Sequence, residues 1–425
     1  MKRLSLFFFV LFFFPFTLSA SPTGEHLTLN DCYQLTLKRS ETLKLSEEDI
    51  KISEAHFLQA LGTILPRINL NYSEFFQDDS SNGDPTVSSS LTQFRRPQAG
   101  IGMSLTLFRG FREFYALRSS KIDAAEKEFK KKEVERLLYG DVATAFFTVA
   151  SLEAEMKSQQ KIKKIVKERI TEIQNRIQLG KSRDSEYAAQ AAELSLIEAD
   201  LEKKKGDLRI AYELLGLLTG LTPQPPIKIE ELNIVLGHYE DWKSNLAKRS
   251  DLQAQNKAIE LAKEDIKVQR SYLLPQLDFN ANTWIYRSGY QNDILWDTTL
   301  NLSVPLFNFS TFGNIREARI KTKQEEIRKE ELNRSSEKEV GRDYVNLRSS
   351  LEQLKKYKLA AKMTEMSYQQ QVKDYQQNLV TNLDVLQSQR TWMQALEQSQ
   401  TAQVQVWAAW AKLKMSSGKI AEIPK

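Results

Sequence analysis

The chain has 425 residues, of which 27% are charged, and it contains only 16 glycines and 11 prolines. This composition favours long helices over a many-stranded sandwich, and the length is ample for a buried core. The formal net charge of +5 is a mild excess, so it does not indicate a nucleic-acid partner.

The N-terminus has the pattern of a secretory signal peptide over residues 1–20. Met1-Lys2-Arg3 forms a basic start, Leu4 to Leu18 is nearly all apolar, and Ser19-Ala20 supplies small residues at the cut. The alternative is a membrane anchor, but this run is shorter than the ~20 residues that span a bilayer. We therefore expect cleavage and export. Cys32 is the single cysteine and lies past the cut, so it forms no internal disulfide and is not placed for lipidation.

The rest of the chain is predicted to hold two copies of one plan, at 21–220 and 246–418. A proline-rich linker at 221–245 joins them, and a short tail follows at 419–425. Each copy opens with a predicted helix, Leu29–Leu65 or Leu246–Leu274, which ends at Pro66 or Pro275. Proline disfavours helix in the residue before it and donates no ladder hydrogen bond, so both prolines indicate helix-to-strand junctions.

Beyond each proline the hydrophobic period changes from near 3.6 to 2, which is typical of strands. In copy one, Ile68, Leu70 and Tyr72 alternate with polar residues, and the alternation resumes after a polar linker at 77–97. Copy two repeats this pattern around a shorter linker at 288–292. The sequence therefore predicts one hairpin in each copy, at 67–108 and 276–307, with strands of about ten residues.

Each hairpin leads into a long helical pattern without proline, at 112–177 and at 314–376. At ~1.5 Å per residue, each helix spans roughly 90–100 Å. A shorter helix returns after each, at 185–218 and 383–415. Helices this long need neighbours along their length, so we predict a mainly helical fold of antiparallel coiled coils that form a tube.

Strands of about ten residues have the length that crosses a bilayer when tilted. No later apolar run reaches the length of a transmembrane helix, so a membrane crossing would use these strands. Open sheet edges are costly in lipid and four strands are too few to close a barrel, so closure needs other copies of the chain. Eight strands from a dimer and twelve from a trimer both stay open here, as does a small soluble sheet.

Several short motifs, repeated in order in both copies, resemble the TolC family of outer-membrane efflux proteins over nearly the whole mature chain. They are Leu27-Thr28-Leu29-Asn30-Asp31, Leu65-Pro66-Arg67-Ile68, Leu107-Phe108-Arg109-Gly110-Phe111, Leu274-Pro275-Gln276-Leu277 and Val304-Pro305-Leu306-Phe307. The resemblance implies a homotrimer with a 12-stranded β-barrel among outer-membrane lipids and an α-barrel in the periplasm. It also implies two partners: a periplasmic adaptor (membrane fusion) protein and an inner-membrane transporter of the RND, ABC or MFS type.

In this family the two helix-to-helix turns contact the adaptor and close the tunnel. The resemblance assigns adaptor contact to Leu179, Gly180, Lys181, Ser182, Asn378, Leu379, Val380 and Thr381, and the periplasmic aperture to Asp384, Glu186, Tyr375 and Gln387. One acidic residue per chain near a narrow end would form a ring that attracts cations. The alternative is that Glu186 and Asp384 are ordinary first-turn acids, which the helix dipole favours by ~0.3–1 kcal/mol.

The second turn departs from the family pattern at three positions. Asn378 replaces the usual glycine, but asparagine tolerates left-handed geometry, so we expect the turn to be kept. Gln387 stands where the family's best-known member has a second aspartate, so weaker cation binding is expected. Val380 occupies the position of that member's basic latch residue, so the closing contacts should differ.

Other functional classes have little support in the sequence. The histidines, His26, His56 and His238, are dispersed, so no metal site is expected. There is no phosphate loop or nucleophile elbow, so we expect no catalytic residue and no cofactor. The leading hypothesis is a passive outer-membrane conduit for small molecules in a tripartite efflux pump. The alternatives are the exit duct of a type I protein secretion system and a soluble periplasmic coiled-coil scaffold.

Overall fold

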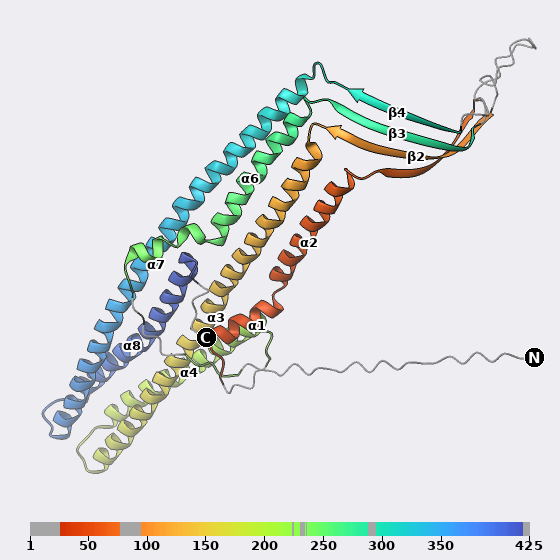
Figure 1. Cartoon of the computed structure of the whole chain (residues 1–425). Helices are drawn as coiled ribbons and strands as arrows, with labels where there is room; N and C mark the ends of the chain where they lie inside the picture. Colours follow the sequence, from red (N-terminus) through yellow and green to blue (C-terminus); the bar gives the residue numbers. More distant parts are fainter. Residues whose placement is uncertain are drawn as a thin grey trace, which may run out of the picture.

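The computed structural model describes residues 26–76, 95–222, 225–229, 234, 236–287 and 295–419. The predicted signal peptide, most of the predicted tail and the linker residues between the described ranges lie outside them. The molecule is an elongated layer of helices with a sheet at one end (Figure 1). We call this end the strand end, and the opposite end, which holds the α3–α4 and α7–α8 turns, the turn end.

The same order of elements occurs twice along the chain. The first half contains α1 (Leu29–Arg39), α2 (Glu41–Gly62), β1 (Arg67–Phe76), β2 (Arg95–Arg109), α3 (Arg112–Gln178) and α4 (Asp184–Thr219). The second half contains α5 (Tyr239–Lys243), the 3-10 turn η2 (Leu246–Lys248), α6 (Ser250–Ser271), β3 (Gln276–Arg287), β4 (Trp296–Ser303), α7 (Phe309–Gln376) and α8 (Asn382–Ser417). In both halves a proline separates the short helix from the strand that follows it.

The predicted helix over Leu29–Leu65 is wrong as one element, because the chain breaks at Ser40. Ser40 has φ −47° and ψ 119°, and its hydroxyl accepts a hydrogen bond from the Leu43 amide at 3.2 Å. A serine in this conformation ends one helix and caps the next. The predicted helix over Leu246–Leu274 likewise starts as the η2 turn, and α6 begins only at Ser250.

The two hairpins join into one antiparallel sheet of order β1-β2-β3-β4. The join is the β2–β3 pairing, in which Gly102 faces Asn282. The strand bounds differ from the prediction at two places: β2 begins at Arg95, inside the predicted linker, and β4 ends at Ser303 rather than at 307. Pro305 explains the early end of β4, since it has no amide to donate. Strands β1 and β4 are left as the two edges.

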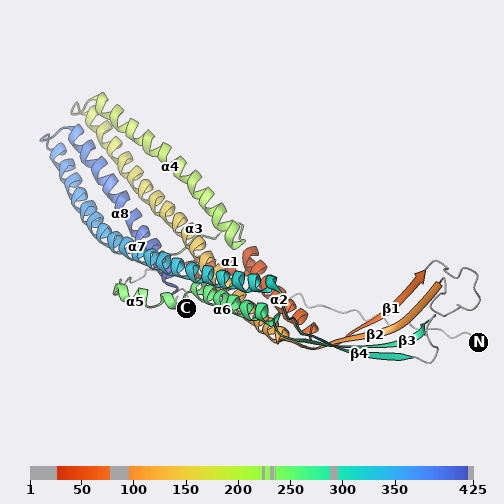
Figure 2. The ribbon, with the colours of Figure 1, turned by 90° about the horizontal axis from the view of Figure 1, so that it is seen from above.

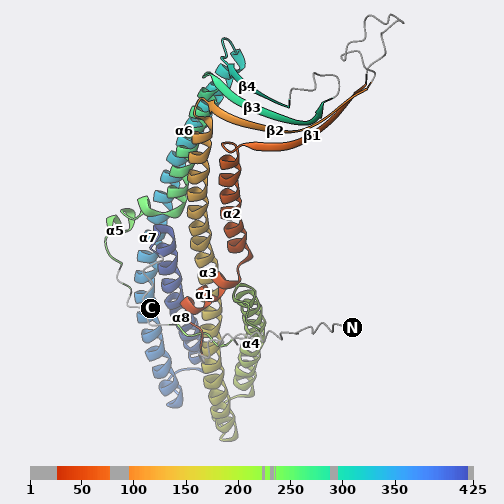
Figure 3. The same cartoon turned by 45° about the vertical axis from the view of Figure 1, so that its right-hand side comes forward.

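Four helices lie side by side at every level of the helical layer. Near the strand end their order is α2, α3, α6, α7, and near the turn end it is α4, α3, α8, α7. Helices α3 and α7 therefore run the full length, while α2 and α4, and likewise α6 and α8, follow one another along it (Figures 2 and 3). Helix α7 forms one edge of the layer, and α2 with α4 forms the other.

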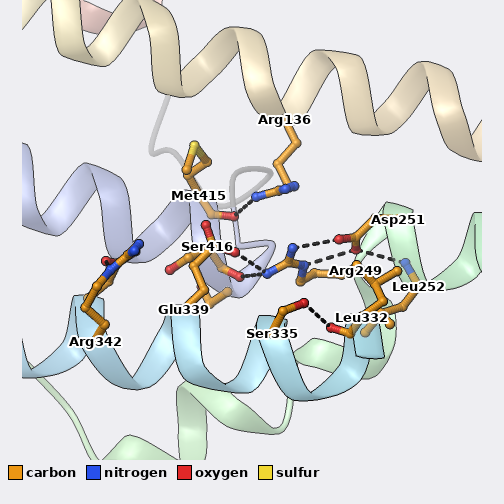
Figure 4. Close-up of polar contacts among 12 residues, drawn as sticks. Arg136, Arg249, Asp251, Leu252, Leu332, Ser335, Glu339, Arg342, Met415 and Ser416 are labelled. Carbon is orange, nitrogen blue, oxygen red and sulfur yellow. Dashed lines mark hydrogen bonds and ion pairs between the residues drawn. The ribbon is translucent and has the colours of Figure 1, made fainter. Parts of the chain in front are cut away.

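The junction between α8 and α6 is held by buried arginines (Figure 4). Arg249 precedes α6 and is 4% exposed; it contacts Asp251, Glu339 and the main-chain oxygen of Ser416. Arg136 of α3 donates to the main-chain oxygen of Met415 at 3.1 Å. The tripeptide Lys-Arg-Ser stands at this position in both halves, at 38–40 and 248–250.

One face of the layer is covered and the other is free. Helix α1 and residues 225–229 pack over α3 and α4, and Cys32 of α1 is fully buried in this contact. The parallel bridge Leu27–Ile227 joins the residues just before α1 to residues 225–229. Trp242 of α5 covers the neighbouring part of α7 and α8. No described segment covers the opposite face.

Among the described residues, one helix contains a stretch long and apolar enough to span a membrane by composition, although no apolar run of this length is predicted beyond the N-terminus. This helix is α3, and 44% of the stretch is buried inside the molecule. Helix α3 packs against α1, α2, α4, α6 and α8, so its apolar character is explained by helix packing.

Candidate functional site

The two turns at the turn end have the same backbone geometry. The Lys181 amide donates to the Arg176 oxygen at 2.8 Å, and the Leu379 amide donates to the Asp374 oxygen at 2.9 Å. One residue in each turn is left-handed: Gly180 has φ 68° and Asn378 has φ 59°. This is the Schellman arrangement, which satisfies the last carbonyls of a helix. Asn378 thus takes the left-handed conformation expected of it from the sequence.

Glu186 and Tyr375 meet between the two turns, although they come from different halves of the chain. The Tyr375 hydroxyl donates to Glu186 Oε2 at 2.6 Å, and the Ser182 hydroxyl donates to the same oxygen at 2.6 Å. Tyr375 is 4% exposed, and burial, followed by the hydrogen bond to Glu186, raises the pKa of its hydroxyl. The contact ties the start of α4 to the end of α7.

Two arginines of α3 lie against the Tyr375 ring. The guanidinium carbons of Arg169 and Arg176 are 4.3 and 4.4 Å from the ring centroid. Each also reaches the second hairpin: Arg176 Nη2 donates to Asn378 Oδ1 at 2.7 Å, and Arg169 Nη2 donates to Asn382 Oδ1 at 3.2 Å. Positive charge over an aromatic face is favourable, most of all where water is excluded. The arginines therefore join the two hairpins at their turns.

Asp384 and Gln387 do not belong to this cluster. Asp384 is exposed and forms a capping box with Thr381, in which the Thr381 hydroxyl donates to Asp384 Oδ2 at 2.6 Å. This hydroxyl holds the pKa of the Asp384 carboxyl below its usual range. Gln387 is exposed, and its main-chain oxygen accepts a hydrogen bond from the Thr391 hydroxyl. Within one chain, Asp384 thus acts as a helix cap, as the first-turn alternative describes.

The surface of the turn end is apolar at several points. Leu179 and Leu379 are 68% and 69% exposed, and Leu383 beside them is 74% exposed. Gly180, Lys181, Asn378 and Thr381 are also exposed, whereas Ser182 and Val380 are half-buried. Exposed apolar residues gathered at one end of a molecule are typical of a protein contact.

Sequence reasoning missed Arg169, Arg176 and Leu383. The arginines stand seven residues apart, on one face of α3, which is a detectable pattern. Their partners lie on α7 and α8, however, and no pattern within α3 identifies them. Leu383 was overlooked because the family motif stops at the turn.

Metal ligation finds no support in the described part of the chain, where no group of three His, Cys, Asp or Glu side chains is gathered closely enough to hold an ion.

Comparison with known proteins gives the family. A family model for outer membrane efflux proteins matches residues 32–221 and 243–419, which together exceed half of the chain. The chain belongs to the outer membrane efflux protein family. It is a subunit of an outer-membrane channel, with its helices in the periplasm, and the alternative of a soluble periplasmic scaffold is set aside.

Individual relatives of this efflux protein are distant in sequence but similar along nearly their whole length. The alkaline protease secretion protein AprF of Pseudomonas aeruginosa is 20% identical over 417 residues, which cover 93% of this chain and 85% of AprF. The crystal structure of CusC superimposes with a TM-score of 0.80 at 16% identity, covering 92% of this chain and 91% of CusC. The structure of the outer membrane protein VceC of Vibrio cholerae superimposes with a TM-score of 0.79 at 16% identity, covering 92% of this chain and 96% of VceC.

Proposed function

We propose that three copies of this chain close into one tube, with twelve strands in the outer membrane and twelve helices at each level of a periplasmic tunnel. The tube is a passive conduit for small molecules and has no catalytic role. The observation that carries this proposal is that each chain has two unpaired edges whose exposed apolar residues match in height. The number three comes from the resemblance to the TolC family.

The sheet has two open edges, β1 and β4. Both edge strands carry exposed apolar side chains: Leu70 of β1 is 74% exposed, and Leu302 of β4 is 67% exposed. An unpaired strand edge in lipid costs several kcal/mol for each unsatisfied group. Pairing of β4 with β1 of the next copy would remove both edges.

Near the turn end, the two helical edges carry apolar residues at the same heights. Helix α7 exposes Val345 and Met363, and α4 exposes Leu214 and Leu196. Counted in residues from Asn378 and from Gly180, Met363 lies nearly level with Leu196, and Val345 lies nearly level with Leu214. An α7 edge can therefore pack against the α4 edge of another copy with apolar side chains in register.

Near the strand end, the same match occurs between α7 and α2. Helix α7 exposes Ile320 and Ile327, and α2 exposes Leu45 and Ile52. Counted in residues from the end of β4 and from the start of β1, Ile320 lies within two residues of the level of Ile52, and Ile327 lies within two residues of the level of Leu45. Since the two edges differ from each other, their contact is head-to-tail, and such contacts form a ring when the rotation between copies closes.

The tunnel would be closed at its turn end and docked there to its partners. Glu186, Tyr375 and Ser182 form the closing contact together with Arg169 and Arg176, and Asp384 contributes one charge per chain to a ring at the aperture. The exposed Leu179, Leu379 and Leu383 provide the contact for a periplasmic adaptor, which connects the channel to an inner-membrane transporter.

Planar-bilayer conductance tests the closing contact. Tyr375→Phe removes the hydroxyl that binds Glu186 and keeps the ring against both arginines, so the resting conductance should rise severalfold. Tyr344→Phe is the matched control: it removes a tyrosine hydrogen bond from the same helix, to the Gly237 oxygen, far from the turns. Equal conductance in both variants would show that Tyr375 is not part of the closing contact.

The aperture ring is tested in the same membranes by Asp384→Ala. This variant should weaken the block of the current by divalent cations, because it removes one negative charge per chain. Unchanged current and unchanged cation block would show that Asp384 does not line the aperture.

A second candidate function is the exit duct of a type I protein secretion system. Its support is the similarity to AprF, whose name describes secretion of an alkaline protease. Deleting the gene separates the two functions. Retention of one specific polypeptide in the cell, with unchanged accumulation of small toxic compounds, would favour the secretion duct over the efflux conduit.

A further inference from the structure

A groove of about 920 Å³ lies between α3, α4 and α8, roughly midway along the helical layer. On α3 it is lined by one helical stripe, which includes Leu137, Thr144 and Ser151. The residues of α3 that pack beneath α1 form another stripe, which includes Tyr139 and Phe146. At ~100° per residue these two stripes point in opposite directions. The groove therefore opens on the free face of the layer.

In the proposed ring, the free face lines the tunnel. The alternative orientation would place α1, α5 and residues 225–229 inside the tube, where they would obstruct it. The inference below rests on this proposed function. Ile210 and Leu214 form the rim of the groove toward α7 of the next copy, so the ring would complete its wall.

The groove combines an apolar surface with excess negative charge. Its walls include Leu137, Phe147, Leu152, Ile210, Leu214 and Val404, and four carboxylates face one lysine, Lys412. Two carboxylates are already paired, Glu155 with Lys204 and Asp343 with Arg342. Among the described residues, Asp141 and Asp207 have no ion pair.

Asp343 adds an independent sign that the groove holds a ligand. It is 1% exposed, and although its Oδ1 accepts from Arg342 at 2.9 Å, its Oδ2 is buried without a hydrogen-bond partner. Leaving a buried carboxylate oxygen unsatisfied is costly unless a donor or positive charge can reach it. Asp343 lies in the groove wall together with the unpaired Asp141 and Asp207.

We propose that this groove binds amphipathic organic cations as they pass along the tunnel. The apolar walls would remove the hydrocarbon part of such a molecule from water, and the free carboxylates would meet its charge. An anion of the same size would be repelled by the same carboxylates. Conduction requires that a bound molecule also leaves, so the groove should bind such cations weakly and release them again.

The test uses the full-length protein in nanodiscs of zwitterionic lipid, with rhodamine 6G as the cationic probe and fluorescein as an anionic one. We expect fluorescence polarisation to show saturable binding of rhodamine 6G and none of fluorescein. The double variant Asp141→Asn with Asp207→Asn should weaken rhodamine binding at least tenfold. The matched control, Glu202→Gln with Glu213→Gln, removes two charges of α4 that do not line the groove and should bind as the parent does.

A second variant addresses shape without a change of charge. Thr144→Trp fills the groove from an exposed position on α3 and should abolish binding of rhodamine 6G. Equal binding by the parent, the double variant and Thr144→Trp would overturn the proposal, as would equal binding of both dyes. Single-channel conductance is recorded on the same purified proteins in planar bilayers. Absence of channels in the parent protein would count against the proposed conduit, whereas normal channels without dye binding would reject only the groove.

Discussion

Arg249 donates a hydrogen bond of 2.8 Å to the main-chain oxygen of Ser416, in the last turn of α8 (Figure 4). The same guanidinium binds Asp251 at 2.6 Å and Glu339 at 2.9 Å. One buried side chain thus joins the start of α6, the end of α8 and the middle of α7. The last carbonyls of a helix lack partners within the helix, and here Arg249 and Arg136 supply them.

Loss of Arg249 should destabilise this junction. Arg249→Met leaves the Ser416 oxygen without a donor and Asp251 and Glu339 without their cation, and breaking a buried ion pair costs about 3–5 kcal/mol. Arg328→Met is the control, because that arginine pairs with Glu325 at the surface, where a pair contributes about 0–1 kcal/mol. Thermal unfolding followed by circular dichroism should show a large fall in Tm for Arg249→Met alone. Similar shifts for both variants would contradict the role of the junction.

The buried amides Gln190 and Gln389 should behave as a coupled pair. Each is 1% exposed, and Gln190 Nε2 donates to Gln389 Oε1 at 3.2 Å, which links α4 to α8. Gln190→Leu alone leaves a buried amide unsatisfied and should cost about 1–3 kcal/mol, whereas the double change to leucine should restore most of it. A double-mutant cycle by chemical unfolding measures the coupling. Additive losses would show that the two amides act independently.

The stability of the start of α8, near the proposed aperture, should depend on pH through Asp384. Its folded-state pKa is lowered, so the stability that it gives to the start of α8 is present at neutral pH. That stability is lost as the pH falls below ~4, through the ordinary pKa of aspartate and then through the lowered value. Amide hydrogen exchange at 382–386 should therefore accelerate below this pH, after correction for the intrinsic rate. The same acceleration in Asp384→Ala would exclude the carboxylate as its cause.

Asn378→Gly should separate the geometry of the turn from its contacts. Glycine adopts the left-handed conformation of Asn378 more readily, so the turn should stay folded. The variant loses only the hydrogen bond from Arg176. We expect higher resting conductance with an unchanged Tm. We expect at least as large a rise in conductance from Arg176→Gln, which also removes the contact with the Tyr375 ring. A conductance equal to that of the parent in both variants would show that this contact does not hold the turns together.

The long helices could be predicted from the sequence to within a few residues, because their apolar spacing is sustained. Helix α3 spans Arg112–Gln178 against a predicted 112–177. Helix α7 begins at Phe309 rather than at 314, since the Asn308 side chain caps it by accepting from the Ser310 amide at 3.2 Å. The break at Ser40 could not be predicted, because the apolar periodicity continues across it. A single serine there both ends α1 and caps α2.

The candidate site could be predicted only in part. The left-handed turns follow from Gly180 and Asn378, whose backbone preferences are local. The meeting of Glu186 with Tyr375 depends on how α4 is rotated against α7, across 189 residues of chain. The arginine contacts depend on the packing of α3 against the second hairpin. No local pattern encodes either arrangement.

Disulfide cross-linking between the two helical edges tests the three-chain tube most directly. Leu196→Cys with Met363→Cys places thiols at matching heights on α4 and α7, and buried Cys32 stays out of reach. Leu196→Cys with Val345→Cys is the control, because its thiols are out of register and disulfides need Cα atoms within ~7 Å. Oxidation in the membrane should give a ladder of bands that ends at three chains for the matched pair, and none for the control. No ladder, equal ladders in both variants, or bands beyond three chains would contradict the proposed tube.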